Sequence, residues 1–428
     1  MTRSFSILFC SFILVVTGCQ PKAKTKAQQA PAAVRLSAAG MKSSCPYLTK
    51  DATGNPVLCW VQATDTTGHH LLYFATSHNG GSTFEAPKAI PTSKGVYPHD
   101  ENLSKIIYKP NGDMLALFAV SNPSDENSYA GLVYYTQSFD GGDSWTAPKQ
   151  LSENTIRSID ERYFDVTLLP NGEVAAVWLD SRKENADKAQ KHMQMNEGTS
   201  MKGMQMDSEG SSLYYASTNG RNGFAREKVI ARHTCQCCRT ALYVDGQRRL
   251  HVAYRGILQD SIRDMMHQVS DDNGSTFSAP ERISPDNWVI DGCPHTGPAM
   301  AANQNGMHYA WFTMGGGSGV YYCTQPEGKS FTARQSVSSV PSAKHPQLMN
   351  LENGNLALVW DEGTQQGNRV GLQWLDASGN FTGRDYLTPD TSNASFPVIA
   401  TAGKVLLVAY TKRQNGQSEV WYQQVPQQ

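Results

Sequence analysis

The 428-residue sequence lacks an excess of charge of either sign. Lys and Arg together number 37 and Asp and Glu number 38, so the net charge is −1 with neutral His. A nucleic-acid-binding protein needs a basic excess that neutralises phosphates, so this class of function is excluded. After residue 20 the chain also lacks any apolar run near the roughly 18 residues that a membrane-spanning helix needs. Glycine and proline are at ordinary levels and aromatic residues make up 9%, which excludes a low-complexity or globally disordered chain.

The one long apolar stretch lies at the N-terminus. Arg3 precedes residues 5–16, FSILFCSFILVV, which have the length of the apolar region of a secretory signal peptide. Residues 16–19, VTGC, resemble the lipobox of bacterial lipoproteins. The resemblance implies a lipid on Cys19, anchoring to a membrane and a place in the cell envelope, periplasmic or at the surface, with the outer membrane favoured. We therefore predict a signal peptide at 1–18, a lipidated cysteine and tether at 19–40, and a folded domain at 41–428.

Three octets in the chain share the pattern S-x-[DN]-x-G-x-[ST]-[FW]. Each is followed by one residue and then Ala-Pro, so chance is a poor explanation. Asp or Asn and Gly favour a tight turn, Ser and Thr hydroxyls bond its backbone, and the aromatic residue anchors it. The octets are Ser77–Phe84, Ser138–Trp145 and Ser270–Phe277. They resemble the Asp box, or BNR repeat, of sialidase-like β-propellers, and the resemblance implies that fold.

The segments around the octets repeat as well. Each unit has an apolar strand, a turn at Asn-Gly or similar, a second strand that ends near Trp or Tyr, a third strand and then the box. The units begin near residues 45, 99, 161, 238, 295, 345 and 396. A period of about 50 residues is typical of a propeller. We predict an all-β, sialidase-like propeller with seven four-stranded antiparallel blades, or six as in typical sialidases. The last unit lacks a fourth strand, which we expect residues 32–38 to supply.

The repeat predicts which residues share a face. Because the boxes join strands three and four, the links into strand one and from strand two to strand three lie on the opposite face. The links into strand one hold residues 99–101, 162–165, 235–239, 291–295 and His345. The links from strand two to strand three hold residues 180–182, Arg255, 263–264, 315–317 and 361–362. We expect the functional site among these residues.

A Met-rich insert, which we place at residues 183–212, interrupts the third unit on this face. Thioethers are soft ligands suited to cuprous copper, and the repeated Met-x-Met spacing resembles exported copper-handling proteins. The alternative is an insert whose Met cluster is accidental, or a Met-rich adhesive surface. The candidate ligands in the insert are His192, Met193, Met195, Met201, Met204 and Met206.

Seven cysteines remain when Cys10 in the signal segment and Cys19 are set aside. Cys45 and Cys59 lie on consecutive strands at similar distances from the turn, so we expect a disulfide or, alternatively, two buried thiols. The other five are odd in number, so at least one is unpaired or binds a ligand, and their spacing does not match a structural zinc site. We expect a soft-metal or redox site there, or a disulfide from Cys293 to Cys235 or Cys237. The candidate metal ligands are Cys235, Cys237, Cys238, Cys293 and His295.

An enzymatic alternative comes from the family resemblance. Segments 235–240, 254–255, 262–264 and 288–295 resemble bacterial envelope proteins that are called exo-sialidases. A sialidase needs three Arg side chains to clamp a carboxylate and an Asp acid/base. The candidates here are Arg239, Arg255, Arg263, Asp165 and Asp291. Binding of copper or another soft metal is the leading prediction. A sialidase-like glycoside hydrolase, or a scaffold for glycans or envelope proteins, is the alternative.

Overall fold

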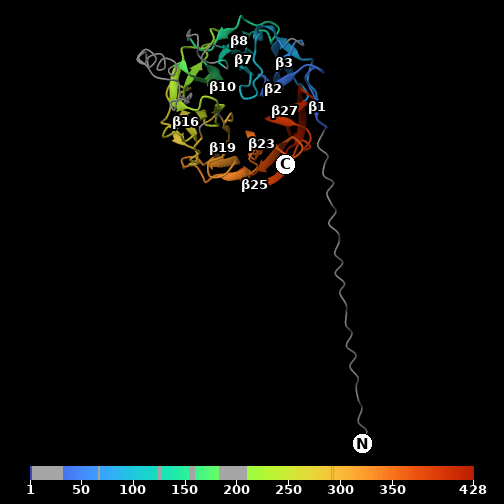
Figure 1. Cartoon of the computed structure of the whole chain (residues 1–428), viewed down its shortest axis with the longest axis vertical. Helices are drawn as coiled ribbons and strands as arrows, with labels where there is room; N and C mark the ends of the chain where they lie inside the picture. The colour runs from blue at the N-terminus through green and yellow to red at the C-terminus, as the bar shows by residue number, and fades with distance from the viewer. Residues whose placement is uncertain are drawn as a thin grey trace, which may run out of the picture.

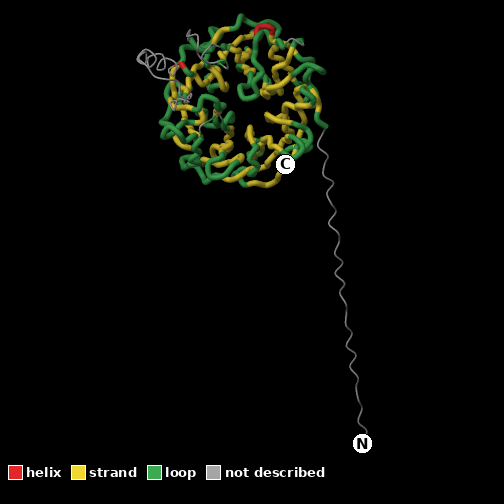
Figure 2. Tube along the Cα trace, in the orientation of Figure 1, coloured by secondary structure: helices red, strands yellow, loops and turns green. Residues whose placement is uncertain are grey.

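The computed structural model describes residues 1, 32–65, 68–123, 128, 130–153, 160–182, 210–290, 292 and 294–428. These residues form a ring of seven four-stranded antiparallel sheets, the blades (Figure 1). Strands and the turns between them dominate the ring, and the short 3-10 helix η1 (Pro91–Ser93) precedes blade 2 (Figure 2). No helix within the described residues is long and apolar enough to cross a membrane. The predicted seven-bladed propeller is confirmed, and the six-bladed alternative is wrong.

Blades 1 to 6 are each built from four consecutive strands, and the first of them is innermost. Blade 1 consists of β2 (Ser43–Lys50), β3 (Pro56–Ala63), β4 (His70–Thr76) and β5 (Lys88–Ile90). Blade 2 consists of β6 (Lys105–Tyr108), β7 (Met114–Ser121), β8 (Gly131–Ser138) and β9 (Lys149–Gln150). Blade 3 consists of β10 (Glu161–Leu168), β11 (Val174–Asp180), β12 (Ser211–Ser217) and β13 (Lys228–Thr234). Blades 4 and 5 consist of β14 (Ala241–Val244), β15 (Leu250–Arg255), β16 (Met265–Ser270) and β17 (Glu281–Arg282), and of β18 (Ala299–Asn303), β19 (Gly306–Thr313), β20 (Gly319–Gln325) and β21 (Gln335–Ser338). Blade 6 consists of β22 (Lys344–Asn350), β23 (Leu356–Gly363), β24 (Asn368–Leu375) and β25 (Phe381–Tyr386).

Blade 7 closes the ring with the two ends of the described chain. It consists of β26 (Ala394–Ala402), β27 (Val405–Gln414), β28 (Gln417–Pro426) and β1 (Val34–Arg35), and β1 is its outermost strand. Val34 pairs with Tyr422 and Arg35 with Trp421. The prediction that residues 32–38 supply the missing strand is confirmed. The propeller therefore begins before residue 41, which is the boundary that the sequence predicted.

One aromatic position repeats through the core of all seven blades. The second strand of each blade carries a large aromatic residue that is at most 3% exposed. In blades 1 to 3 this ring stacks on a third-strand tyrosine, at centroid distances between 5.9 and 6.5 Å. The burial of such rings stabilises each sheet and accounts for the aromatic ending of the second strands in the sequence. The residues are Trp60, Phe118, Trp178, Tyr254, Trp311, Trp360 and Tyr410.

The Asp boxes hold neighbouring blades together. In the box of blade 2, Ser138 Oγ donates to Asp140 Oδ1 and accepts from the backbone N of Gly142, both at 2.8 Å. The box aromatic packs against a ring of the preceding blade, at centroid distances between 4.9 and 6.3 Å. The pairs are Phe84 with Tyr422, Trp145 with Phe74 and Phe277 with Tyr215, and Phe224 at the corresponding turn of blade 3 packs on Tyr135 in the same way. The boxes are therefore structural elements between blades.

The close packing of box glycines predicts a large difference between two Gly→Ala substitutions. Gly274 has φ +82°, and a Cβ there would lie 2.1 Å from Tyr215 Cζ. Gly141 has φ +74°, and a Cβ there would meet nothing within 4 Å. We expect Gly141→Ala to lower the free energy of unfolding by about 1 kcal/mol through its backbone conformation alone. Gly274→Ala should lower it by about 3 kcal/mol because a steric clash is added. Urea unfolding followed by Trp fluorescence measures both, and equal losses would contradict the inter-blade contact.

Candidate functional site

The seven first strands surround the axis of the ring, and each contacts the next one. We call the face on which the first strands begin and the second strands end the mouth face. Four first strands carry a β-bulge near their start, with a residue at positive φ. A bulge re-aims the side chains beside it, so these strands direct their side chains differently from a regular strand. The four residues are Cys45, Tyr163, His345 and Phe396.

Residues 99–102, HDEN, form a plug on the axis at the mouth face. They precede β6 of blade 2, and their side chains reach the six other blades or the links that lead into them. These contacts tie the plug to the blades around it. Its contacts are Asp100 with Cys45 Sγ of blade 1 (3.8 Å), Asn102 Oδ1 with the backbone N of Tyr163 of blade 3 (2.9 Å), Glu101 with Arg239 before blade 4 (3.0 Å), the ring of His99 with that of His295 before blade 5 (6.4 Å), Glu101 with His345 of blade 6 (2.6 Å), and Asp100 with Arg413 of blade 7.

Glu101 and His345 form the charged centre of the plug. Glu101 Oε1 lies 2.6 Å from His345 Nε2, and His345 Nδ1 lies 2.8 Å from Asp361 Oδ2. Burial alone would lower the pKa of His345, but the charges of Asp361 and Glu101 raise that pKa to about 9. Burial acts to raise the pKa of Glu101, but the charges of His345 and Arg239 hold that pKa below its ordinary value. At neutral pH the plug is therefore fixed by buried charges of opposite sign.

A second buried ion pair joins blades 2 and 3 next to the plug. Lys105 Nζ lies 3.1 Å from Asp165 Oδ1 and donates to the backbone O of Phe164 at 2.6 Å. Asp165 Oδ2 accepts from the backbone N of Leu242 in blade 4 at 2.7 Å. Burial lowers the pKa of Lys105, and the charge of Asp165 opposes this change. Asp165, a candidate acid/base, is thus held between three blades by its ion pair and its hydrogen bond.

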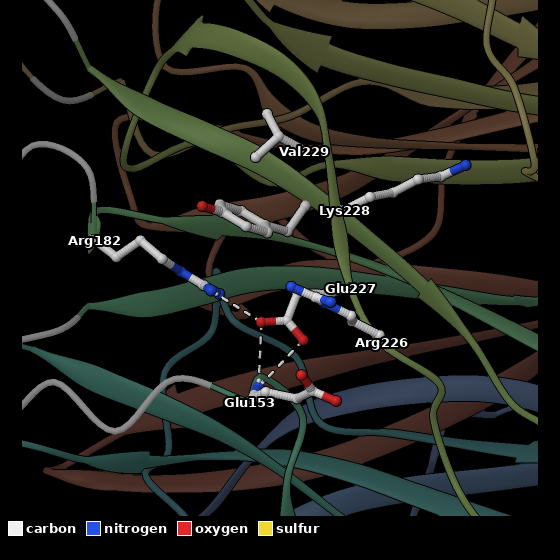
Figure 3. A pocket seen from close by; sticks show the side chains of 7 residues that line it. Glu153, Arg182, Arg226, Glu227, Lys228 and Val229 are labelled. Atoms are coloured by element: carbon white, nitrogen blue, oxygen red, sulfur yellow. Dashed lines mark hydrogen bonds and ion pairs between the residues drawn. The ribbon is translucent and has the colours of Figure 1, made fainter.

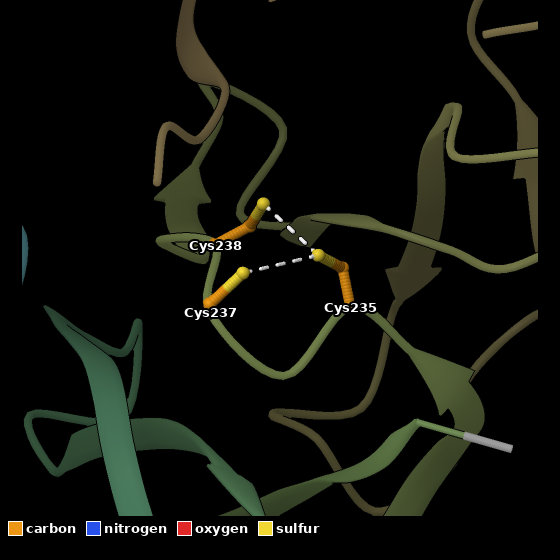
Figure 4. A group of neighbouring side chains, drawn as sticks. All are labelled: Cys235, Cys237 and Cys238. Atoms are coloured by element: carbon orange, nitrogen blue, oxygen red, sulfur yellow. Dashed lines mark hydrogen bonds between the residues drawn. The ribbon is translucent and has the colours of Figure 1, made fainter. Parts of the chain in front are cut away.

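Three cysteine sulfurs meet in the link between β13 and β14 (Figure 4). Cys235 Sγ lies 3.2 Å from Cys238 Sγ and 3.7 Å from Cys237 Sγ, and all three side chains are buried. The backbone N of Cys235 donates to the backbone O of Arg255 at 2.8 Å, which ties the link to β15. We call Cys235, Cys237 and Cys238 the trithiol. Among the described residues, these cysteines form the one group of three or more possible metal ligands whose ligand atoms all lie within 4.8 Å of one another.

The three sulfurs differ in their acidity. Hydrogen bonds from Cys237 and Cys238, together with the charge of Arg255, hold the pKa of the Cys235 thiol well below its usual value although burial opposes them. Burial and the neighbouring Cys235 raise the pKa of Cys238 to about 12. One sulfur is therefore disposed to be a thiolate and its neighbour to be a thiol.

Other predicted metal ligands lie apart from the trithiol or outside the described residues. His295 is exposed and lies beside His99, so it is not part of the sulfur group. Cys293, His192, Met193, Met195, Met201, Met204 and Met206 lie outside the described residues, as does the predicted lipid attachment at Cys19. The described end of the insert does reach this place. β12 begins with Ser211, which pairs with Thr234, the residue before Cys235.

The predicted disulfide between Cys45 and Cys59 is not formed. Both are buried free thiols. The bulge in β2 shifts the register, so that Cys59 faces Tyr47. Cys45 Sγ donates to Asp100 at 3.8 Å, whereas Cys59 Sγ donates to the backbone O of Ser104 at 3.8 Å.

The candidate arginines of a carboxylate clamp are held by different partners. Arg239 pairs with Glu101 in the plug. Arg255 is 1% exposed and donates to the backbone O of Arg263 at 2.9 Å and of Phe312 at 2.8 Å. Arg263 Nε donates to the backbone O of Ile290 at 3.3 Å. All three serve the fold in this arrangement, and Asp291 lies outside the described residues.

A polar cavity of about 400 Å³ lies on the outer part of blade 3 (Figure 3). Arg182, stacked over the ring of Tyr214 at 4.0 Å, points at Glu227 and lies 2.9 Å from its Oε1. Arg182 also pairs with the buried Asp180 at 2.6 Å. The backbone N of Glu153 donates to Glu227 as well. Acidic and basic side chains therefore satisfy one another here, and the cavity presents no surface of a single charge.

The sequence pattern places residues 99–101, 235–239 and His345 together on the mouth face, but it misses two cations that form ion pairs there. Lys105 and Arg413 were not among the candidates, although both hold buried or half-buried carboxylates. The one available signal was Lys105 itself, a charged residue directly before the apolar run IIY. No local pattern pointed to Arg413.

The architecture and the Asp boxes define a sialidase-like seven-bladed propeller. Residues 98–359 match the model of a family described as a BNR repeat-like domain, and the chain belongs to that family. No curated protein matches the sequence.

Several solved structures resemble the propeller. A protein of unknown function from Dyadobacter fermentans is 13% identical, with 94% of this chain and 99% of that chain covered and a TM-score of 0.51. The polysaccharide lyase Uly1 is 11% identical, with 90% of each chain covered and a TM-score of 0.54. The Hadza microbial sialidase Hz136 is 10% identical, with 90% of this chain and 66% of that chain covered and a TM-score of 0.49. At these identities the likeness to the first two concerns the fold alone.

Proposed function

We propose that this propeller binds a soft metal ion, copper(I), at the trithiol on its mouth face. The observation that carries the proposal is the meeting of three buried sulfurs within 4.8 Å of one another. Three thiolates at about 2.3 Å from one ion in a plane would lie about 4 Å apart. The separations of 3.2 and 3.7 Å from Cys235 need only a small expansion to reach this value. The residues present therefore fit a three-coordinate soft ion.

The number of ligands favours copper(I) over zinc. Structural zinc sites almost always have four ligands in a tetrahedron, and the described residues offer three here. Thiolate sulfur selects soft ions such as copper(I). Hydrogen bonds from Cys237 and Cys238 lower the pKa of Cys235 and so favour its thiolate form, and the charge of Arg255 contributes to that shift. Attachment through Cys19 and capture of copper by the Met-rich insert belong to the same proposal and rest on the sequence.

Metal retention tests the proposal directly. The full chain, purified in detergent, is reduced, exposed to excess copper(I) without oxygen, desalted and analysed for metal by mass spectrometry. We expect close to one copper per chain, and less than a tenth of that in the double variant Cys235→Ser/Cys238→Ser, because one sulfur remains. Cys323→Ser is the matched control, since Cys323 is equally buried but lies on β20 of blade 5. Retention by the double variant equal to that of the control would contradict the proposal.

Two further experiments separate the alternatives. Deletion of residues 190–207 should leave retention at saturating copper intact and slow the loading at limiting copper. Hydrolysis of sialosides by a folded chain that retains no copper would favour the glycoside hydrolase instead. Whatever these two experiments show, the trithiol proposal stands only if the chain retains copper.

A further inference from the structure

We infer that the trithiol has a second chemical state, a disulfide between Cys235 and Cys238, and that metal binding requires this disulfide to be reduced. The inference adds regulation to the function proposed above and rests on it for the metal half of the statement. The disulfide half stands on the geometry of the sulfurs alone.

The geometry favours one pair among the three sulfurs. Cys235 and Cys238 form a C-x-x-C sequence, and their sulfurs at 3.2 Å are closer than the 3.7 Å between Cys235 and Cys237. A disulfide has a sulfur separation of about 2.05 Å, so the pair must approach by about 1 Å. Both residues lie in the link between Thr234, the last residue of β13, and Ala241, the first of β14. The approach therefore needs movement of one loop, and the ladders of blades 3 and 4 stay intact.

The chemistry needs an external oxidant, and exported proteins meet disulfide-forming conditions. A small disulfide such as oxidised glutathione supplies the two-electron oxidation. The thiolate of Cys235 attacks it, forms a mixed disulfide and releases one glutathione thiolate. The Cys238 thiol then loses its proton to solvent, and the resulting thiolate attacks Cys235 Sγ and releases the second glutathione thiolate. A dithiol reductant reverses both steps.

The two states of the trithiol exclude one another. The disulfide uses two of the three proposed ligands and leaves Cys237 as the remaining sulfur of the set. The three side chains are at most 3% exposed, so exchange requires local opening of the link and should be slow. Bound copper(I) occupies the same sulfurs and should slow the oxidation further. The protein would then hold copper only where a dithiol reductant keeps Cys235 and Cys238 reduced.

Thiol mapping of the full chain tests the disulfide without metal. Reduced protein in detergent is incubated with oxidised glutathione, its free thiols are alkylated, and after reduction the newly exposed thiols receive a second, heavier label. We expect the second label on Cys235 and Cys238 and the first on Cys45, Cys59 and Cys323, which lie apart and serve as internal controls. Cys237→Ser should give the same pattern. Heavier label on Cys237 in place of Cys238, or none on the pair, would overturn the inference.

Copper retention then tests the exclusion. The oxidised protein should retain less than a tenth of the copper(I) held by reduced protein, and treatment with dithiothreitol followed by desalting should restore it. Retention unchanged by a mapped Cys235–Cys238 disulfide would overturn the regulatory statement. A mapped disulfide in a chain that never retains copper would defeat the proposed function and leave the redox pair standing.

Discussion

Replacement of Glu101 by Ala should destabilise the propeller by about 3–5 kcal/mol. Glu101 is 6% exposed, and its carboxylate is the shared partner of His345 and Arg239, which come from two further blades. Without the carboxylate both cations stay buried and lose a partner, which is costly because water cannot replace it. Urea unfolding of the metal-free chain, followed by Trp fluorescence, measures the loss.

Glu419→Ala is the matched control for this change. Glu419 also pairs with an arginine, Arg35 at 2.9 Å, but the two side chains are 26% and 40% exposed. Exposed ion pairs contribute about 1 kcal/mol or less. Glu101→Gln keeps the shape of the side chain and should still be clearly less stable than the control, because its charge is gone. A Glu101→Ala variant as stable as Glu419→Ala would show that the plug does not hold the ring.

His345, the buried histidine that pairs with Glu101 of the plug, should make stability depend on pH between about 6.5 and 9. His345 has a folded pKa of about 9, above its ordinary value of 6.5, because Asp361 and Glu101 together outweigh burial. A group whose pKa is raised on folding contributes stability that is complete below the unfolded pKa and is lost as pH rises through the folded one. This contribution is about 3 kcal/mol.

A comparison with His345→Gln isolates that contribution from other titrating groups. The free energy of unfolding is measured for both chains at pH 6 and pH 9.5. The wild type should exceed the variant at pH 6 by about 3 kcal/mol more than it does at pH 9.5. The side chains against the imidazole are Glu101, Asp361 and the ring of Phe396, whose centroid is 4.1 Å away. An equal difference at both pH values would show that folding does not raise the pKa of His345.

The fold could be predicted from the sequence because the turn and strand patterns that determine it are local. An Asp box is a turn whose hydrogen bonds join residues at most a few positions apart, as from Ser138 to Gly142. The spacing of such turns determines the length of a unit, and the number of units determines the number of blades. Even the closing strand was predictable, because the last unit contained three strands of the four.

The site was predictable only as far as its face. The mouth-face links follow from strand order, so residues 99–101, 235–239 and His345 were placed together correctly. Their pairing was not predictable, because a charge pattern does not say which distant residue will match it. Asp100 and Arg413 form an ion pair although most of the chain lies between them in the sequence. The Cys45–Cys59 disulfide failed for a related reason, since one bulge in β2 changes the register beyond what residue counting can detect.

The way the ring closes has a mechanical consequence. β1 is the outermost strand of blade 7 and contributes two paired residues, Val34 and Arg35. A load applied to the chain ahead of residue 32 reaches the propeller at this short ladder, supported by the Arg35–Glu419 pair and by Ser37 Oγ, which accepts from the backbone N of Val420 at 3.0 Å. These few contacts would peel away one after another at low force. The other six blades, each with four consecutive strands of its own, would stay folded, so tension on the N-terminal side is relieved at the seam before it reaches the mouth face.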